Sequence, residues 1–122
     1  MIEYIKFATL PVRDQDRALA FYTQKLGFAV AQDRPFQSDL RWIELSLASA
    51  RSRLWFGCRA DDEPADEPSL ILMTSDVKAT HAALVARGVE FTLAPADAPW
   101  SPGEMFALFR DSEGNMLMLG QA

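Results

Sequence analysis

The stretch LPVRDQDRALAFYTQKLGF, residues 10–28, decides the fold because it joins the end of a strand to a complete helix. Asp14 follows an apolar run, and its carboxylate can accept hydrogen bonds from the free amides of a first helical turn. Gly27 supplies the left-handed backbone on which many helices end. We therefore predict a strand up to Asp14 and a helix over 15–26. Its buried stripe is predicted at three positions with helical spacing: Leu19, Tyr22 and Leu26.

Three further strands are predicted in the first half of the chain. They are FAVAQD (28–33), LRWIELSLA (40–48) and SRLWFG (52–57). The second of these alternates, so that Trp42 and Glu44 fall on one face while Ile43 and Leu45 fall on the other. The first half thus reads strand, helix, strand, strand, strand.

The second half of the chain repeats this order. SLILMTSD (69–76) predicts a strand ending in aspartate, and VKATHAALVARG (77–88) predicts a helix ending in glycine. Three strands follow: VEFTLAPA (89–96), EMFALFRD (104–111) and NMLMLGQ (115–121). Asp14 and Asp76 are 62 residues apart and Gly27 and Gly88 are 61 apart, which indicates a duplicated unit.

The segment RADDEPADEP, residues 59–68, separates the two halves. Two prolines and five acids leave it little to bury, so we predict a solvated linker. We therefore expect one α+β domain over residues 1–122, with module one at 1–58 and module two at 69–122.

The composition limits the partners of the protein. The formal net charge of −5 and the absence of a Lys/Arg cluster predict no nucleic-acid partner. No apolar run approaches the length of a membrane span, so no membrane partner is expected. The single cysteine, Cys58, cannot form an internal disulfide, and we expect it to be a small packing residue in a cytoplasmic protein.

Several motifs together resemble the vicinal oxygen chelate superfamily, which includes glyoxalase I, bleomycin-resistance proteins and extradiol dioxygenases. They are LPVRD, AFYTQKLGF, DVKATHAALVARGV and FRDSEGNMLML, which span nearly the whole chain. The last turn of the family usually reads Asp-Pro-Asp-Gly, whereas Ser112 and Glu113 stand in its middle here. The resemblance implies two βαβββ modules whose sheets curl around a cleft that receives a small ligand. It also implies a homodimer.

The same resemblance locates four positions that hold the metal in the metal-dependent members. In this chain they are Phe7, Glu44, Leu70 and Met118. Phenylalanine and leucine have no donor atom, and a thioether suits Cu(I) better than Mg, Mn, Zn or Fe. One carboxylate cannot hold Zn or Fe(II) alone. We therefore expect no metal and no other cofactor.

Strand alternation predicts which side chains line the cleft. The candidates share apolar or aromatic character, with one acid among them: Phe7, Thr9, Trp42, Glu44, Leu70, Leu72, Met116 and Met118. Trp100, in a loop rich in proline and glycine, is a candidate lid or subunit contact, and Phe109 is a further lining candidate. The same residues could instead be core. The face occupied by Trp55 is left open.

Glu44 admits two interpretations. As a general base or ligand anchor among apolar neighbours, it would lose hydration, and its pKa would rise. Alternatively, it forms a salt bridge with Arg41, Arg53 or another arginine. His81, the only histidine, lies on the predicted helix stripe and is expected to pack rather than to bind a ligand.

Three functions are compatible with these observations. The first is a metal-free protein that sequesters a small aromatic or cationic molecule, as bleomycin-resistance proteins do, with the acidic composition favouring a cationic or neutral ligand. The second is a lyase, an isomerase or a dioxygenase-related enzyme that uses Glu44 as its base, or that builds a metal site from other residues. The third is an interaction module whose cleft is filled by its own side chains.

Overall fold

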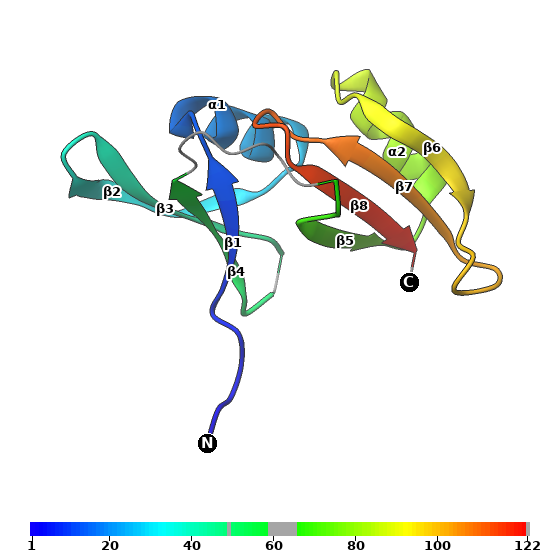
Figure 1. Cartoon of the computed structure of the whole chain (residues 1–122), viewed down its shortest axis with the longest axis horizontal. Coiled ribbons are helices and arrows are strands. Elements are labelled where there is room, and N and C mark those ends of the chain that lie inside the picture. The colour runs from blue at the N-terminus through cyan, green and yellow to red at the C-terminus, as the bar shows by residue number, and fades with distance from the viewer. Residues whose placement is uncertain (49, 59–65, 122) are drawn as a thin grey trace. The chain divides into compact units, whose positions relative to one another are not determined.

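A computed structural model describes residues 1–48, 50–58 and 66–121 of the protein. The chain divides into two compact units, residues 1–62 and 63–122, and each has the order βαβββ (Figure 1). The predicted α+β fold of two βαβββ modules is confirmed. Residues 59–65 of the predicted linker lie outside the described residues, so the limits of the linker stay a prediction.

Unit 1 is a four-stranded sheet with one helical segment. Its elements are β1 (Phe7–Val12), α1 (Gln15–Ala20), η1 (Phe21–Lys25), β2 (Ala29–Gln37), β3 (Leu40–Ser46) and β4 (Arg53–Cys58). The strand order is β1-β4-β3-β2, in which β1 and β4 run parallel and the other neighbours run antiparallel.

The helical segment begins as predicted, but its second half is a π-helix. Asp14 caps α1 by accepting from the backbone N–H of Arg17 at 3.0 Å, and Gly27 has a φ of 84°. The wider π turn of η1 brings the neighbours Phe21 and Tyr22 into the core together. The predicted stripe is therefore wrong in part: of its three members only Tyr22 is fully buried, while Leu19 and Leu26 are half-buried.

One face of the unit 1 sheet forms the core beneath the helix. Leu10, Ile43 and Leu45 are completely buried there. The Tyr22 ring lies 5.8 Å from that of Phe56, which shows that the helical segment covers this face. Because strand side chains alternate, Trp42 and Glu44 must lie on the opposite face, as predicted.

Unit 2 repeats the arrangement. Its elements are β5 (Leu70–Thr74), α2 (Val77–Ala86), β6 (Phe91–Asp97), β7 (Met105–Arg110) and β8 (Met116–Gln121), with the strand order β5-β8-β7-β6. Asp76 caps α2 by accepting from the backbone N–H of Ala79 at 3.0 Å. No helix in the described residues is long and apolar enough to cross a membrane.

The strand register of unit 2 corrects two predicted cleft residues. Leu70 and Leu72 pair with Leu117 and Leu119, whereas Met118 pairs with Ile71. The prediction was displaced by one residue, and a shift of one residue exchanges the two faces of a strand. Leu70 and Leu72 therefore do not share a face with Met118.

Phe109 is likewise a core residue. It pairs with Leu117 and is completely buried, and its ring lies 5.1 Å from Phe91. The imidazole of His81 on α2 contacts the same Phe91 ring at 4.4 Å. Phe109 therefore lies on the helix side of the sheet, and His81 packs as predicted.

The turn between β7 and β8 is a buried polar network. One carboxylate oxygen of Asp111 accepts from the backbone N–H groups of Glu113 and Asn115, each at 2.8 Å, and the other accepts from the Asn115 side-chain amide at 3.0 Å. All three residues are nearly inaccessible to water. Gly114 completes the turn with a φ of 82°. Asp111 therefore organises this turn.

Replacing Asp111 by alanine should destabilise the protein because it leaves two buried backbone N–H groups without acceptors. The expected loss of unfolding free energy is about 3 kcal/mol, at roughly 1–3 kcal/mol for each unsatisfied group. Urea unfolding followed by circular dichroism measures it. Asp14→Ala, which removes an exposed helix cap, serves as the control and should cost about 1 kcal/mol. A loss for Asp111→Ala no larger than that of the control would contradict this role.

Candidate functional site

Four aromatic residues of unit 1 gather on the sheet face opposite the helix. Trp42 lies at the centre: its ring centroid is 5.1 Å from that of Trp55, 5.2 Å from Phe36 and 6.1 Å from Phe7. We call these four residues the aromatic face. Each contact is tilted or edge-to-face, the arrangement that aromatic quadrupoles favour.

The register places Trp55 and the predicted residues on this one face. Trp55 pairs with Thr9 of β1 on one side and with Glu44 of β3 on the other, so all three side chains point the same way. This settles the face that the alternation pattern left open. Gly57, two residues along β4, leaves space beside the indole: a Cβ atom there would lie 3.6 Å from Trp55 and 3.0 Å from Thr9.

Phe36 belongs to the site although the sequence did not indicate it. The predicted strand ended at residue 33, before Pro35, because proline cannot donate to a strand ladder. The structure accommodates Pro35 on β2, an edge strand, with a register shift between Pro35 and Gln37. The strand therefore continues to Gln37 and brings Phe36 against Trp42.

A cavity of about 190 Å³ opens beside the aromatic face. The β3–β4 ladder consists of two residue pairs, Glu44 with Trp55 and Leu45 with Leu54, although both strands continue beyond it. The two strands separate past Trp55, and the cavity occupies the gap between them. Its apolar walls include Phe36, Leu40, Val12, Trp55 and Phe56. Cys58, also at the cavity, is exposed and not the packing residue that we expected.

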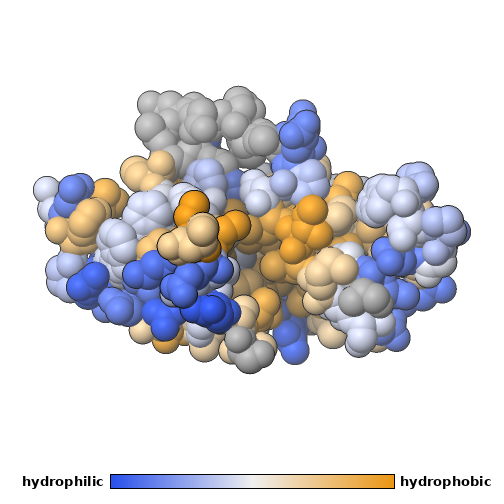
Figure 2. Space-filling view, turned by 90° about the horizontal axis from the view of Figure 1, so that it is seen from below, coloured by the Kyte–Doolittle hydropathy of each residue, from blue (hydrophilic) through white to orange (hydrophobic). Residues whose placement is uncertain are grey.

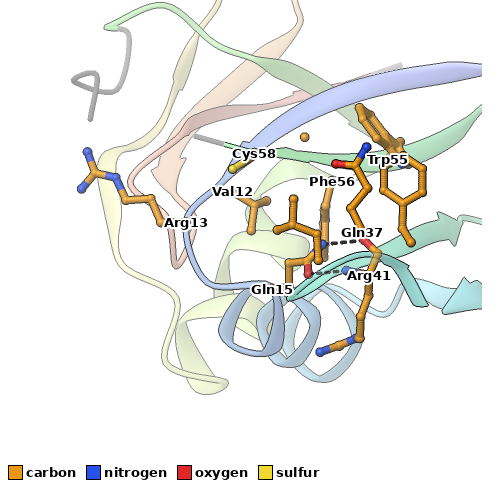
Figure 3. Close-up of a pocket in the computed structure, with 11 residues that line it drawn as sticks. Val12, Arg13, Gln15, Gln37, Arg41, Trp55, Phe56 and Cys58 are labelled. Atoms are coloured by element: carbon orange, nitrogen blue, oxygen red, sulfur yellow. Dashed lines mark hydrogen bonds between the residues drawn. The ribbon is translucent and has the colours of Figure 1, made fainter. Parts of the chain in front are cut away.

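The amide of Gln15 keeps the separated end of β3 satisfied. Its Nε2 donates to the backbone carbonyl of Arg41 at 2.8 Å, and its Oε1 accepts from the backbone N–H of Arg41 at 3.0 Å (Figure 3). A side-chain amide thus takes the place of a neighbouring strand. Unpaired backbone groups are costly when they are shielded from water. This pair of bonds therefore lets the sheet open without leaving the backbone N–H and carbonyl of Arg41 unpaired.

Glu44 is the most strongly engaged side chain of the site. It is 4% exposed; its Oε2 accepts from the Trp42 indole N–H at 2.6 Å, and its Oε1 accepts from the Arg53 guanidinium at 2.8 Å. The hydrogen bond from Trp42 is the main cause that lowers the pKa of Glu44, with Arg53 adding to it against the opposing effect of burial. The predicted rise is therefore wrong, because bonds to the charged form outweigh desolvation.

The alternative of a salt bridge applies to Glu44, with Arg53 as the partner. Arg41, the other arginine considered, instead bonds to Asp16 at 2.8 Å and to Asp33 at 2.9 Å. These two carboxylates raise the pKa of Arg41. Glu44 is thus ionised at neutral pH, with both oxygens occupied, which makes it a weak proton acceptor.

The residues at the family's metal positions do not fit a metal centre. Phe7 contributes a ring, Leu70 lies on the other face of its strand, and Glu44 is already bonded to Trp42 and Arg53. Among the residues that the structure describes, no group of three His, Cys, Asp or Glu side chains is placed to hold a metal ion.

The remaining candidates lie on unit 2. Met118 shares its sheet face with Ile71, which is 57% exposed. Trp100 is 60% exposed and packs on Phe106 at 4.8 Å. Apolar side chains also reach the surface on the side of the molecule seen in Figure 2. Met118 and Trp100 are accessible to a ligand, and their role stays a prediction.

Comparison with known proteins identifies the family. The profile of the glyoxalase/bleomycin resistance protein/dioxygenase superfamily matches residues 4–119. The chain therefore belongs to this superfamily, and the resemblance seen in the sequence is confirmed.

Three similar proteins illustrate the relationship. The uncharacterized protein YetH of Bacillus subtilis (strain 168) is 30% identical, over 98% of each chain. A superfamily member from Sphaerobacter thermophilus DSM 20745, whose crystal structure is known, is 30% identical in sequence. Its TM-score is 0.85, and the match covers 99% of this chain and 98% of that one. TnmS3, an antibiotic binding protein from Streptomyces sp. CB03234, is 31% identical, with a TM-score of 0.82. The match covers 98% of this chain and 96% of TnmS3.

Replacing Glu44 by glutamine should remove a pH-dependent part of the stability. Because folding lowers the pKa of Glu44, its contribution is present above the ordinary value of 4.5 and disappears as the pH falls through the lower folded-state pKa. The variant should lose about 1.5 kcal/mol at pH 7, as expected for a bond to a charged group that water partly screens. This difference should vanish under acid conditions.

Urea midpoints measured for both proteins from pH 3 to pH 7 give the comparison. Asp16→Asn is the control, because its carboxylate is 83% exposed in its pair with Arg41 and should contribute little. A difference between wild type and Glu44→Gln that stays constant across the pH range would show that the charge of Glu44 does not stabilise the fold.

Proposed function

We propose that this protein binds a planar aromatic small molecule at the aromatic face and its cavity, and holds it without chemical change. The observation that carries the proposal is the continuous contact of Phe36, Trp42 and Trp55 beside an open cavity. Aromatic side chains bind flat ligands by stacking on them, with little dependence on the substituents of the ligand.

The size of the cavity supports a ligand group of one or two rings. An apolar protein cavity of about 150 Å³ holds benzene, and the cavity here measures about 190 Å³. Whole drug-sized ligands occupy roughly 300–1,000 Å³. The cavity therefore suits one part of a ligand, and the rest would extend over the partly exposed rings of the aromatic face. An open cavity also argues against an interaction module with a filled cleft.

The relatives support a binding protein. TnmS3 is an antibiotic binding protein, and its chain matches this one over nearly its full length. By analogy, we propose that the present protein sequesters a small aromatic compound. A homodimer and a cytoplasmic location remain predictions from the sequence.

Catalysis by Glu44 is less well supported. An effective general base has a pKa near the working pH and a free lone pair directed at the substrate. Glu44 has a lowered pKa and accepts a hydrogen bond on each oxygen. A metal-assisted reaction at this position is opposed by the donor set, because Phe7 and Leu70 have no donor atom and one carboxylate cannot hold Zn or Fe(II) alone.

Calorimetric titration with 2-naphthamide, a neutral two-ring aromatic, tests the proposal. We expect one molecule bound per chain. Trp55→Leu should weaken binding about tenfold, because ring stacking contributes about 1–3 kcal/mol and 1.4 kcal/mol corresponds to tenfold. Recovery of unchanged ligand after incubation would agree with binding alone.

Two further variants complete this experiment. Val85→Ala, on the exposed side of α2, is a control that should leave binding unchanged. Trp100→Leu tests the other aromatic candidate. If Trp100→Leu weakens binding and Trp55→Leu does not, the ligand binds to unit 2 and the proposal is contradicted.

A further inference from the structure

The aromatic face is locally cationic although the protein as a whole is acidic. Arg34 pairs with Trp42 across β2 and β3, and its guanidinium lies 5.7 Å from the Trp42 ring. Lys6, directly before β1, has its ammonium nitrogen 5.2 Å from the Phe7 ring. Arg53 completes a set of three cations around the rings. The net charge of −5 therefore does not describe this surface.

Among the described strand carboxylates of unit 1, only that of Glu44 lies on the same sheet face as these cations. β2 and β3 carry the acids of the unit 1 sheet, Asp33 and Glu44. Asp33 pairs with Ile43, on the core side, and bonds to Arg41. Glu44 is 4% exposed and lies beneath its two hydrogen-bond donors. A ligand at this face therefore meets positive charge at the surface while the compensating negative charge is buried.

The cations retain donors for a ligand. Arg34 and Lys6 form no ion pair within the described part of the chain. The side chain of Arg53 is 41% exposed and donates one N–H to Glu44, whereas a guanidinium carries five N–H donors. Arginine can therefore bind a carboxylate or another anionic oxygen while keeping its bond to Glu44.

The indole of Trp55 carries a further unused donor, and the ligand class inferred here does not depend on it. Its N–H is buried and has no hydrogen-bond partner among the described residues, and its ring lines the cavity. An unpaired buried donor is rare in folded proteins. Because that nitrogen has almost no accessible surface, an acceptor oxygen in the cavity would reach it only if the indole moved on binding.

We propose that the ligand is an aromatic anion: a planar ring system bearing a carboxylate or an acidic hydroxyl group. Arg34 and Arg53 select the anionic oxygen, and Trp42 and Trp55 stack on the ring. This inference rests on the proposed function and specifies its ligand class. It reverses the preference for cationic or neutral ligands that the overall charge suggests. Salt screens the interaction of a ligand with distant charges, whereas Arg34 and Arg53 lie beside the rings.

Three probes that share one ring system test the inference. They are 2-naphthoate, 2-naphthamide and 2-naphthylmethylammonium, which are anionic, neutral and cationic. Calorimetry should show 2-naphthoate binding about tenfold more tightly than the amide, with the ammonium weakest. Raising the salt concentration should reduce the advantage of the anion.

Substitution of Arg34 separates charge selection from stacking. Arg34→Gln should weaken the binding of 2-naphthoate about fivefold and leave 2-naphthamide within twofold. Lys78→Gln is the matched control, because it removes the same charge from exposed α2. This control should leave the affinities of the three probes, and therefore their order, unchanged.

The outcomes distinguish the two proposals. Probes that bind in a Trp55-dependent way, with the ammonium equal to or tighter than the naphthoate, would overturn the aromatic-anion inference and leave the proposed function standing. Equal loss for all three probes in Arg34→Gln would also overturn it. Failure of all three probes to bind, or binding that Trp55→Leu does not weaken, would overturn the proposed function itself.

Discussion

The Glu44 carboxylate, held by the Trp42 indole and the Arg53 guanidinium, is the interaction on which the site depends. Burying a carboxylate is costly unless hydrogen bonds compensate for its lost hydration, and both oxygens of Glu44 have a donor. The bond from Trp42 also fixes the indole that contacts Phe7, Phe36 and Trp55. The same interaction therefore keeps the acid ionised, engages both of its oxygens and orders the aromatic face.

The second constraint is the separation of β3 from β4. A sheet that opens leaves unpaired backbone groups, which proteins satisfy with other donors and acceptors. Here the amide of Gln15, in the first turn of α1, bonds to both backbone groups of Arg41. The helix that the LPVRD stretch initiates thus supports the cavity as well as the core. Its first residue bonds to Arg41, which lines the cavity together with Phe36 and Trp55.

The sequence predicted the fold well, because its signals are local. Asp14 and Asp76 are helix caps, and Gly27 and Gly88 have left-handed backbone. Short apolar or alternating runs located the strands along the chain. The site was predicted less completely. Leu70 and Leu72 were assigned to the wrong face by one residue of register, and Phe36 was missed because Pro35 hid the extension of an edge strand. The direction of the Glu44 pKa shift depends on where Trp42 and Arg53 point, which no sequence pattern specifies.

The central claim is that a ligand stacks on Trp42 and Trp55 of the aromatic face. The indole N–H signals of the three tryptophans report on this binding most directly. Two-dimensional NMR of ¹⁵N-labelled protein, with each signal assigned by substitution, would follow a titration with 2-naphthoate. We expect the Trp42 and Trp55 signals to shift together and to saturate at one ligand per chain. If both signals stay in place while calorimetry detects binding, the ligand lies elsewhere and the account is contradicted.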